Sequence, residues 1–491
     1  MFKSLDFDYK IFNAFLVLGV IFVLPIIIAD YYYIDDLGRS IVGYSGWSSD
    51  GRPVADMVME SLGFGLPLTD ISPIPLILSI ATLSLSCTLL AKSAGFKSRA
   101  AAVISLFPII ANPFFLSNLS YKFDSLTMSL AVLFSCIPFT LRCMKAFPNV
   151  VLTTTCIVIS LCLYQAASNA FVILAVSFFI LESCKNKGCI KAIILNVVSF
   201  AIAYAIYLKL IVPHYVTGEY STGHSDILPL SLDSLGSIAN NIGMSVNLIK
   251  SFMTGYAGNM FLLLFSVSMV CIIVIAFCSF INSKNIKGLI ISLIVFASPA
   301  IIFVSIPGVV LALKNPVLMP RVYIGFGFAI AASMSIIYFT LFRQFKSLVL
   351  VMAVPVMFLF SFGATYGNSL KAQKEFDVFV LSNISSDINR LGLSGKKYIV
   401  VDGYMPKSPV TMLAYQKYPL VEMMTPGYLA DGWVWGNSLM HHYLMTQVFP
   451  SPETQAAIRA DRCNLKVESS NNIYKIMSKD DVVVVSFIKT C

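Results

Sequence analysis

Apolar stretches of about 20 residues recur through the first three quarters of the chain, and this is the length that a helix needs to cross the hydrocarbon core of a bilayer. Hydrophobic residues make up 57% of the sequence, charged residues only 12%, and the mean hydropathy is +0.81. These values lie far outside the range of soluble proteins. The sequence therefore predicts a polytopic α-helical membrane protein.

The spacing of the apolar stretches predicts about eleven transmembrane helices. Residues 149–184 form an apolar run too long for one crossing, so we expect two short helices that meet at YQAASNA. No small-residue cleavage site follows the first run, so we expect that helix to be retained. The expected crossings are 11–29, 72–91, 100–117, 126–142, 149–164, 168–184, 192–212, 259–281, 288–305, 321–342 and 347–364.

Basic residues gather in alternate loops between these crossings, so the net charge of +9 indicates helix orientation rather than nucleic-acid binding. The richer set of loops is predicted to be cytoplasmic. The loop at 30–71, the turn at 118–125, the loop at 213–256 and the chain after 365 then lie outside. The richer set holds Lys3, Lys10, Lys92, Lys97, Arg99, Arg142, Lys145, Lys185, Lys187, Lys191, Lys284, Lys287, Arg343 and Lys346.

The composition changes near residue 365, which divides the chain into a membrane domain, residues 1–365, and a small external α/β domain, residues 366–491. Helix-like residues near 370–390 precede a strand at KYIVVD, a loop rich in Tyr, Pro, Gly and Trp, and a strand at DDVVVVSFI. Cys463 and Cys491 are the only cysteines of this domain and are candidates for a disulfide in an oxidising compartment. The other nine are expected to behave as small hydrophobic residues.

Asp35 and Asp36 stand where the first apolar run ends. A carboxylate at the edge of hydrocarbon marks a functional site or begins a solvated loop. The density of polar residues in the same external loop, residues 30–71, favours a site. These residues are Arg39, Trp47, Asp50, Arg52 and Asp56, and the loop also contains the turn sequences GYSGW and SSDGRP.

Three further polar segments lie at predicted external turns. In NLSYKFDS, Lys122 and Asp124 are either part of a site or a snorkelling lysine with a helix-capping aspartate. In YQAASN, Gln165 and Asn169 hydrogen-bond either a ligand or the opposing helix. In LKNPVLMPR, Lys314 and Arg321 either hold a lipid phosphate or anchor a helix end.

No GxxxxGK[ST], GxGxxG or GxSxG sequence occurs between a strand and a helix, which argues against a soluble nucleotide-binding or hydrolase domain. No cysteine or carboxylate has metal-ligand spacing around the four histidines, so we expect no structural zinc.

The order of these segments resembles a known family. IDD follows the first helix, then come R…GY…W…GRP, NP…NLSYKFDS, YQ at a short turn and an external PR. This order resembles the Gtr type II glucosyltransferases of phages and bacteria, which modify O-antigen and belong to the GT-C group of polyprenyl-phosphate-sugar transferases. The resemblance covers about residues 1–365. It implies serotype conversion of lipopolysaccharide at the bacterial inner membrane, an undecaprenyl-phosphate-glucose donor, an O-antigen acceptor and a periplasmic C-terminal domain.

The resemblance implies a catalytic carboxylate in the first external loop, which is Asp35 or Asp36, and places the later external aspartate at Asp124. One carboxylate would accept the proton of an acceptor hydroxyl while the sugar inverts at its anomeric carbon. Positive side chains would stabilise the departing phosphate, and aromatic rings would stack on the sugar. The cations available are Arg39, Arg52, Lys122 and Arg321, and the aromatic residues are Tyr33 and Trp47.

No metal ion is required by this scheme, because phosphate is an adequate leaving group; a divalent cation is compatible with it but is not indicated.

Two alternative functions stay open. The chain could be another GT-C enzyme, such as a protein mannosyltransferase or a lipid A aminosugar transferase. It could also be a transporter or flippase of a lipid-linked sugar, although related halves and broken helices, which are typical of transporters, are not evident.

Overall fold

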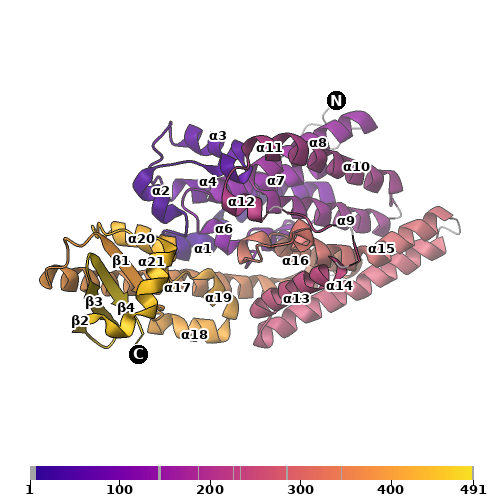
Figure 1. Ribbon diagram of the computed structural model, residues 1–491. Helices are drawn as coiled ribbons and strands as arrows, with labels where there is room; N and C mark the ends of the chain where they lie inside the picture. The colour runs from indigo at the N-terminus through magenta and orange to yellow at the C-terminus, as the bar shows by residue number, and fades with distance from the viewer. Residues whose placement is uncertain are drawn as a thin grey trace. The chain divides into compact units, whose positions relative to one another are not determined.

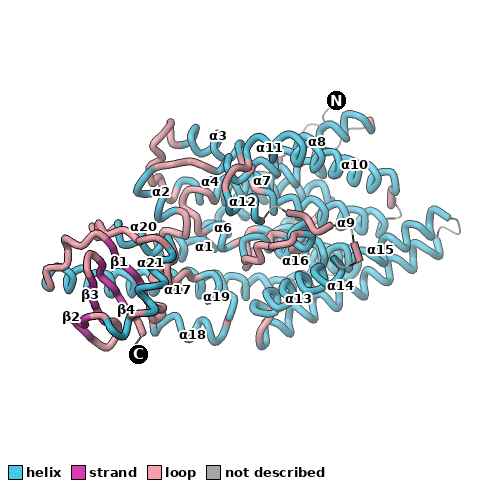
Figure 2. Tube along the Cα trace, in the orientation of Figure 1, coloured by secondary structure: helices cyan, strands magenta, loops and turns pink. Residues whose placement is uncertain are grey.

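The computed structural model describes residues 7–141, 145–185, 187–224, 226–229, 231–232, 234–282, 286–343 and 346–488. It is mainly helical, with one small sheet near the C-terminus (Figures 1 and 2). Lys3, Arg142, Lys284 and Cys491 lie outside the described residues, so the disulfide stays a prediction.

The chain forms two compact units. The membrane unit comprises Met1–Leu24, Ser45–Gly65 and Ile71–Ala364. The C-terminal unit comprises Pro25–Tyr44, Leu66–Asp70 and Thr365–Cys491, so residues 30–44 of the first external loop pack with the C-terminal part of the chain. The predicted division at 365/366 stays a prediction.

Within the described residues, nine helices are long and apolar enough to cross a membrane, which confirms the polytopic helical class. Two shorter apolar helices, Arg99–Ile109 and Ser125–Thr140 (α7), lie within or close to the predicted ranges 100–117 and 126–142. The count of eleven crossings stays a prediction. The long helices are α1 (Tyr9–Ala29), α4 (Ile74–Ala94), α8 (Ala146–Leu163), η3 with α9 (Gln165–Cys184), α10 to α11 (Ile190–Tyr215), α14 (Gly255–Asn282), α15 (Ile286–Ser305), α16 with η7 (Gly325–Phe342) and the end of η8 with α17 (Val349–Arg390).

The apolar run at 149–184 is two helices, as predicted. α8 ends at Leu163, Tyr164 is extended with φ −161° and ψ 109°, and α9 (Ser168–Cys184) follows after the short turn η3 (Gln165–Ala167).

The crossing expected at 100–117 is not one continuous helix. α5 (Arg99–Leu106) passes into the 3-10 turn η2 (Phe107–Ile109), and buried irregular chain then leads through α6 (Leu116–Leu119) to α7. Pro108 and Pro113 explain the break, because proline has no N–H to donate and restricts the residue before it. The Asn112 side-chain amide donates to the Ile324 carbonyl oxygen at 2.9 Å. A buried backbone acceptor near this break thus has a hydrogen-bond partner inside the protein.

α17 (Ala353–Arg390) is too long to lie wholly within a membrane. Its 38 residues are about 57 Å long, against about 30 Å of hydrocarbon. Charged residues begin at Lys371. We therefore take its apolar part, up to residue 364, as membrane-spanning, and the polar remainder forms the predicted helix near 370–390.

Shorter elements connect these helices and complete the C-terminal unit. They are α2 (Asp36–Val42), η1 (Trp47–Asp50), α3 (Pro53–Leu62), η4 (Tyr207–Ile211), α12 (Glu219–Gly223), α13 (Ser234–Phe252), η5 (Gly308–Ala312), η6 (Pro320–Val322), α18 (Pro409–Lys417), α19 (Pro419–Met424), α20 (Val434–His441), α21 (Pro452–Ala460) and η9 (Arg462–Asn464).

A four-stranded sheet is the core of the C-terminal unit (Figure 2). The strand order is β1-β4-β3-β2, with β1 (Tyr398–Asp402) parallel to β4 (Val482–Ser486). The two strands predicted at KYIVVD and DDVVVVSFI are confirmed as this parallel pair, with β1 at one edge of the sheet. The hairpin of β2 (Lys466–Ser470) and β3 (Lys475–Lys479) is additional, and it pairs antiparallel with β4. One hydrophobic cluster of the sheet consists of Val400, Leu465, Met477 and Val484.

Candidate functional site

Asp35 and Asp36 lie at the start of the short helix α2, in the C-terminal unit. Asp36 is 0% exposed, and its Oδ2 accepts a hydrogen bond from the Tyr33 backbone N–H at 3.2 Å. Asp35 is half-buried and makes no capping hydrogen bond with its side chain. The two neighbouring carboxyl groups therefore differ in environment: Asp36 is enclosed and bonded to backbone, whereas Asp35 has the greater access to solvent.

Hydrogen bonds to the C-terminal part of the chain hold this turn in place. The Tyr428 hydroxyl accepts from the Ile34 N–H at 2.9 Å and donates to the Tyr32 carbonyl oxygen at 2.8 Å. The Tyr33 hydroxyl donates to the Met424 carbonyl oxygen at 3.2 Å. Tyr33 is only 3% exposed, so in this conformation it positions the turn, and its ring face is not available to a sugar.

Arg39 contacts Tyr44 within the same unit. Its Nε donates to the Tyr44 carbonyl oxygen at 3.2 Å, and its guanidinium carbon lies 4.9 Å from the centre of the Tyr44 ring. The side chain is buried, with 4% exposure. These contacts close the loop that follows α2.

A second cluster, the Arg52–Asp124 cluster, lies in the membrane unit. Arg52 donates to Asp124 through Nη1 to Oδ2 at 3.0 Å and Nη2 to Oδ1 at 2.7 Å, while its Nε donates to the Leu163 carbonyl oxygen at 2.7 Å. Its guanidinium also lies over the Tyr164 ring, 5.0 Å from the ring centre. Asp124 stands at the N-cap position of α7, but its side chain makes no capping hydrogen bond there and instead forms a buried ion pair with Arg52.

Arg321 joins this cluster through Tyr164. The Tyr164 hydroxyl donates to the Arg321 carbonyl oxygen at 3.0 Å, and Arg321 Nη1 donates to the Tyr121 hydroxyl at 2.5 Å. Arg321 is half-buried, whereas Arg52 is 7% exposed. The structure thus brings Arg52, Asp124 and Arg321 together from three distant parts of the sequence.

Gln165 braces the loop that carries Arg52. Its Nε2 donates at 2.8 Å to the Asp50 carbonyl oxygen and at 2.8 Å to the Tyr207 hydroxyl, which itself donates to the Gly51 carbonyl oxygen at 3.1 Å. These hydrogen bonds are within the protein, and the ligand-binding role of Gln165 stays a prediction.

Trp47, Lys122 and Lys314 occupy separate positions in the membrane unit. The Trp47 side chain is enclosed, with 3% exposure, and its backbone N–H donates to Asp56 at 2.9 Å. Lys122 is half-buried in the turn before α7. Lys314 is exposed and pairs with Asp226 at 3.3 Å. Trp47 adjoins the Arg52–Asp124 cluster through backbone, because its carbonyl oxygen accepts from the Arg52 N–H at 3.0 Å.

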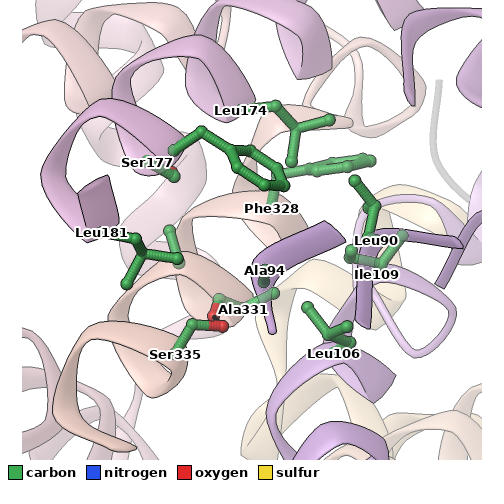
Figure 3. A pocket seen from close by; sticks show the side chains of 12 residues that line it. Leu90, Ala94, Leu106, Ile109, Leu174, Ser177, Leu181, Phe328, Ala331 and Ser335 are labelled. Carbon is green, nitrogen blue, oxygen red and sulfur yellow. Dashed lines mark hydrogen bonds between the residues drawn. The ribbon is translucent and has the colours of Figure 1, made fainter. Parts of the chain in front are cut away.

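One apolar pocket between helices of the membrane unit is too small for a sugar. Its volume is about 30 Å³, the share of one water molecule in the liquid, and residues such as Leu90, Leu174 and Phe328 line it (Figure 3). Its two serines, Ser177 and Ser335, donate to carbonyl oxygens of their own helices. The pocket is therefore part of the packing between helices.

Among the described residues, no group of three or more His, Cys, Asp or Glu side chains is arranged to hold a metal ion.

The residues that sequence reasoning missed are mainly tyrosines, Tyr121, Tyr164, Tyr207 and Tyr428, whose hydroxyls join distant segments. Tyrosine is frequent at membrane interfaces without any ligand, so only their position beside Asp, Arg or Gln motifs could have singled them out.

Comparison with known proteins gives two matches. The model of a family described as "Glucosyl transferase GtrII" matches residues 24–331. The chain is also 28% identical to a protein of Salmonella phage P22 described as an uncharacterized 55.3 kDa protein in the gtrB 5' region, over 98% of this chain and 99% of the relative. No solved structure matches. The family match extends from the end of α1 past Arg321, so it includes Asp35, Asp36 and the Arg52–Asp124 cluster but not Tyr428.

Proposed function

Because the chain belongs to the GtrII glucosyltransferase family, as its resemblance predicted, we propose that it transfers glucose from undecaprenyl-phosphate-glucose to a hydroxyl of the O-antigen polysaccharide, at the periplasmic face of the inner membrane. The family supports a glycosyltransferase of O-antigen modification, and the position of the phage P22 relative beside gtrB agrees with it. A multi-pass membrane protein suits a donor whose tail stays in lipid while its sugar lies in water.

The proposed reaction is a single displacement. The acceptor oxygen forms a bond to the anomeric carbon of glucose, and the bond between that carbon and the phosphate oxygen breaks. The acceptor proton passes to a carboxylate, and undecaprenyl phosphate leaves with the bonding electrons. Because no glycosyl-enzyme forms, the configuration at the anomeric carbon inverts.

The observation that carries the assignment of the base is the difference between Asp35 and Asp36. A general base must reach the proton that it takes. Asp36 is 0% exposed and accepts from backbone, whereas Asp35 is half-buried on the same turn. We therefore assign the base to Asp35 and the positioning of the turn to Asp36.

Positive charge for the departing phosphate comes from Arg321, with Lys122 as a second cation. Arg52 is the weaker candidate, because its charge is matched by Asp124 in a buried bidentate pair. The role that we give this pair is to fix the loop at 50–52 and the turn before α7, and thereby to position Arg321 through Tyr164. Positioned charges of this kind stabilise a transition state without reorganisation.

The direct test uses purified protein in detergent with undecaprenyl-phosphate-[¹⁴C]glucose and O-antigen. We expect label to enter the polysaccharide as one glucose per modified repeat, with the anomeric configuration opposite to that of the donor. Transfer to protein or to lipid A in the same assay would favour the alternative GT-C enzymes. Movement of the donor across vesicle membranes with no transfer would favour the flippase.

The orientation is tested separately by reporter fusions after residue 370, in the polar part of α17. We expect an alkaline phosphatase fusion to be active and a fluorescent protein that fails to fold in the periplasm to be dark. The opposite pair of signals would place the C-terminal unit in the cytoplasm and exclude periplasmic transfer.

A further inference from the structure

The C-terminal unit contains a cavity of about 80 Å³ that the proposed reaction does not use. We call it the tyrosine pocket. It is enclosed by the first external loop, the polar part of α17 and the segment around α20. The lining residues that matter below are Tyr31, Tyr428, Tyr443, Asp377, His442 and Leu37.

Asp377 is the carboxylate that lines the tyrosine pocket. It is 3% exposed, and its Oδ1 accepts from Gln373 Nε2 at 2.8 Å. Gln373 is itself held, because its Oε1 accepts from the Ser408 N–H at 3.0 Å. Asp377 Oδ2 is buried and has no hydrogen-bond partner among the described residues. A buried carboxyl oxygen in this situation is costly unless a ligand or solvent satisfies it.

The walls of the pocket are rigid aromatic rings. Tyr31 and Tyr428 stack with ring centres 5.6 Å apart and planes at 18°. Their hydroxyls are tied to carbonyl oxygens of Pro426 and Tyr32. Burial raises the pKa of both tyrosines, so the rings stay uncharged. Aromatic rings with a few fixed polar groups, here Asp377, His442 and Lys374, are typical of a site that orients a small polar ligand.

The pocket shares α2 with the proposed base. Leu37, which lines the pocket, follows Asp35 and Asp36 directly. His442 Nε2 lies 3.1 Å from the Leu37 carbonyl oxygen and 3.1 Å from the Ser40 hydroxyl, so this wall of the pocket also holds α2. A group bound in the tyrosine pocket therefore has a fixed position relative to α2, and the candidate base Asp35 stands at the start of that helix.

On these grounds we propose that the tyrosine pocket binds the hydroxyl-bearing edge of one sugar residue of the acceptor polysaccharide, with Asp377 Oδ2 as its hydrogen-bond partner. The proposal rests on the glucosyl transfer proposed above. The acceptor suits the site better than the donor, because the pocket is built from polar segments outside the spanning part of α17. A volume of about 80 Å³ has room for about three waters, which suits the edge of a pyranose ring.

The test measures acceptor binding without the reaction. Saturation-transfer NMR detects O-antigen oligosaccharide on the full-length protein in detergent, with no donor present, for wild type, Asp377→Ala, Tyr443→Ala and the control Glu375→Gln. Glu375 is exposed on the same helix and pairs with Lys371 at the surface. Tyr443 is half-exposed at the pocket, so its replacement threatens folding less than that of Asp377.

We expect Asp377→Ala to weaken acceptor affinity about 10- to 100-fold, as for loss of a hydrogen bond to a charged group, and Tyr443→Ala to weaken it several-fold. Glu375→Gln should bind like wild type, and the KM for the donor should not change in either pocket variant. Unchanged acceptor affinity in the folded Tyr443→Ala and Asp377→Ala proteins would overturn the proposal. Acceptor binding by wild type without any transfer would instead overturn the proposed function and leave the pocket as a saccharide site.

Discussion

Arg52 and Asp124, 72 residues apart in the sequence, form a bidentate ion pair with both side chains less than 10% exposed. Arg52 also bonds to the end of α8 and lies over Tyr164. Three separate segments of the membrane unit are thus joined at one guanidinium, and the charges of Arg52 and Asp124 neutralise each other. This is why we assign the pair to positioning and leave catalysis to other groups.

Removal of one partner should destabilise the protein strongly. Because Arg52→Ala or Asp124→Ala leaves a buried charge uncompensated, we expect each to cost about 3–5 kcal/mol of unfolding free energy. The double variant Arg52→Leu/Asp124→Leu should recover much of this loss. Thermal unfolding in detergent measures the cycle. Lys314→Ala, which breaks the exposed pair with Asp226, is the control and should cost less than about 1 kcal/mol; equal losses for both pairs would contradict a structural role of the buried one.

Arg321 should act on the chemical step. If its charge stabilises the departing phosphate, Arg321→Ala should lower kcat about 100- to 1,000-fold, and Arg321→Lys should restore part of it. The measurement is kcat with saturating donor and acceptor. Arg390→Ala, which removes an exposed cation from the end of α17, is the matched control and should have no effect. A normal kcat in Arg321→Ala would assign this arginine to anchoring its helix end.

Asp377 should make stability depend on pH. Burial raises its pKa to about 7, although the Gln373 amide, Lys407 and the Tyr31 hydroxyl oppose the rise. Tyr415 of α18 and Tyr443 are the other titratable groups whose pKa it affects. The folded protein therefore keeps a proton that the unfolded chain releases near pH 4. The contribution of this carboxyl to stability is therefore greatest below pH 4 and is lost as the pH rises through 7.

The size of this effect has an upper bound of about 4 kcal/mol, since one pKa unit corresponds to about 1.4 kcal/mol. The Asp377→Asn side chain cannot titrate. The free energy of unfolding of this variant should therefore fall less between pH 4 and 7 than that of wild type, by the amount that Asp377 contributes. Unfolding temperatures in detergent across this range check it, with Glu375→Gln as the control. Identical slopes for wild type and Asp377→Asn would show that the carboxyl ionises normally.

The parts of the structure that were predictable from the sequence are those that depend on local pattern. Apolar length identified most of the spanning helices and the split at Tyr164, and runs of β-branched residues identified β1 and β4. The β2–β3 hairpin was missed, because KVESS and KIMSK carry few apolar residues in alternation. The break after α5 was signalled by Pro108 and Pro113 but hidden within an apolar run.

The site was predictable in its residue types and only partly in its arrangement. Asp35, Asp124 and Arg321 stand out because charge is costly beside apolar runs. Their partners do not, since the pairing of Arg52 with Asp124 depends on tertiary contacts that leave no periodic trace in the sequence. The tyrosine pocket is assembled from residues near 31, 377 and 443, which no spacing rule connects.

The central claim is that Asp35 takes the proton of the acceptor, and glucosyl transfer by purified Asp35→Asn tests it most directly. We predict a loss of at least about 100-fold in kcat, with donor KM little changed, because a general base contributes about 100- to 10,000-fold. Asp36→Asn, whose amide oxygen can still accept from the Tyr33 N–H, should lose much less, and Glu375→Gln nothing. Transfer by Asp35→Asn at the wild-type rate would contradict the account.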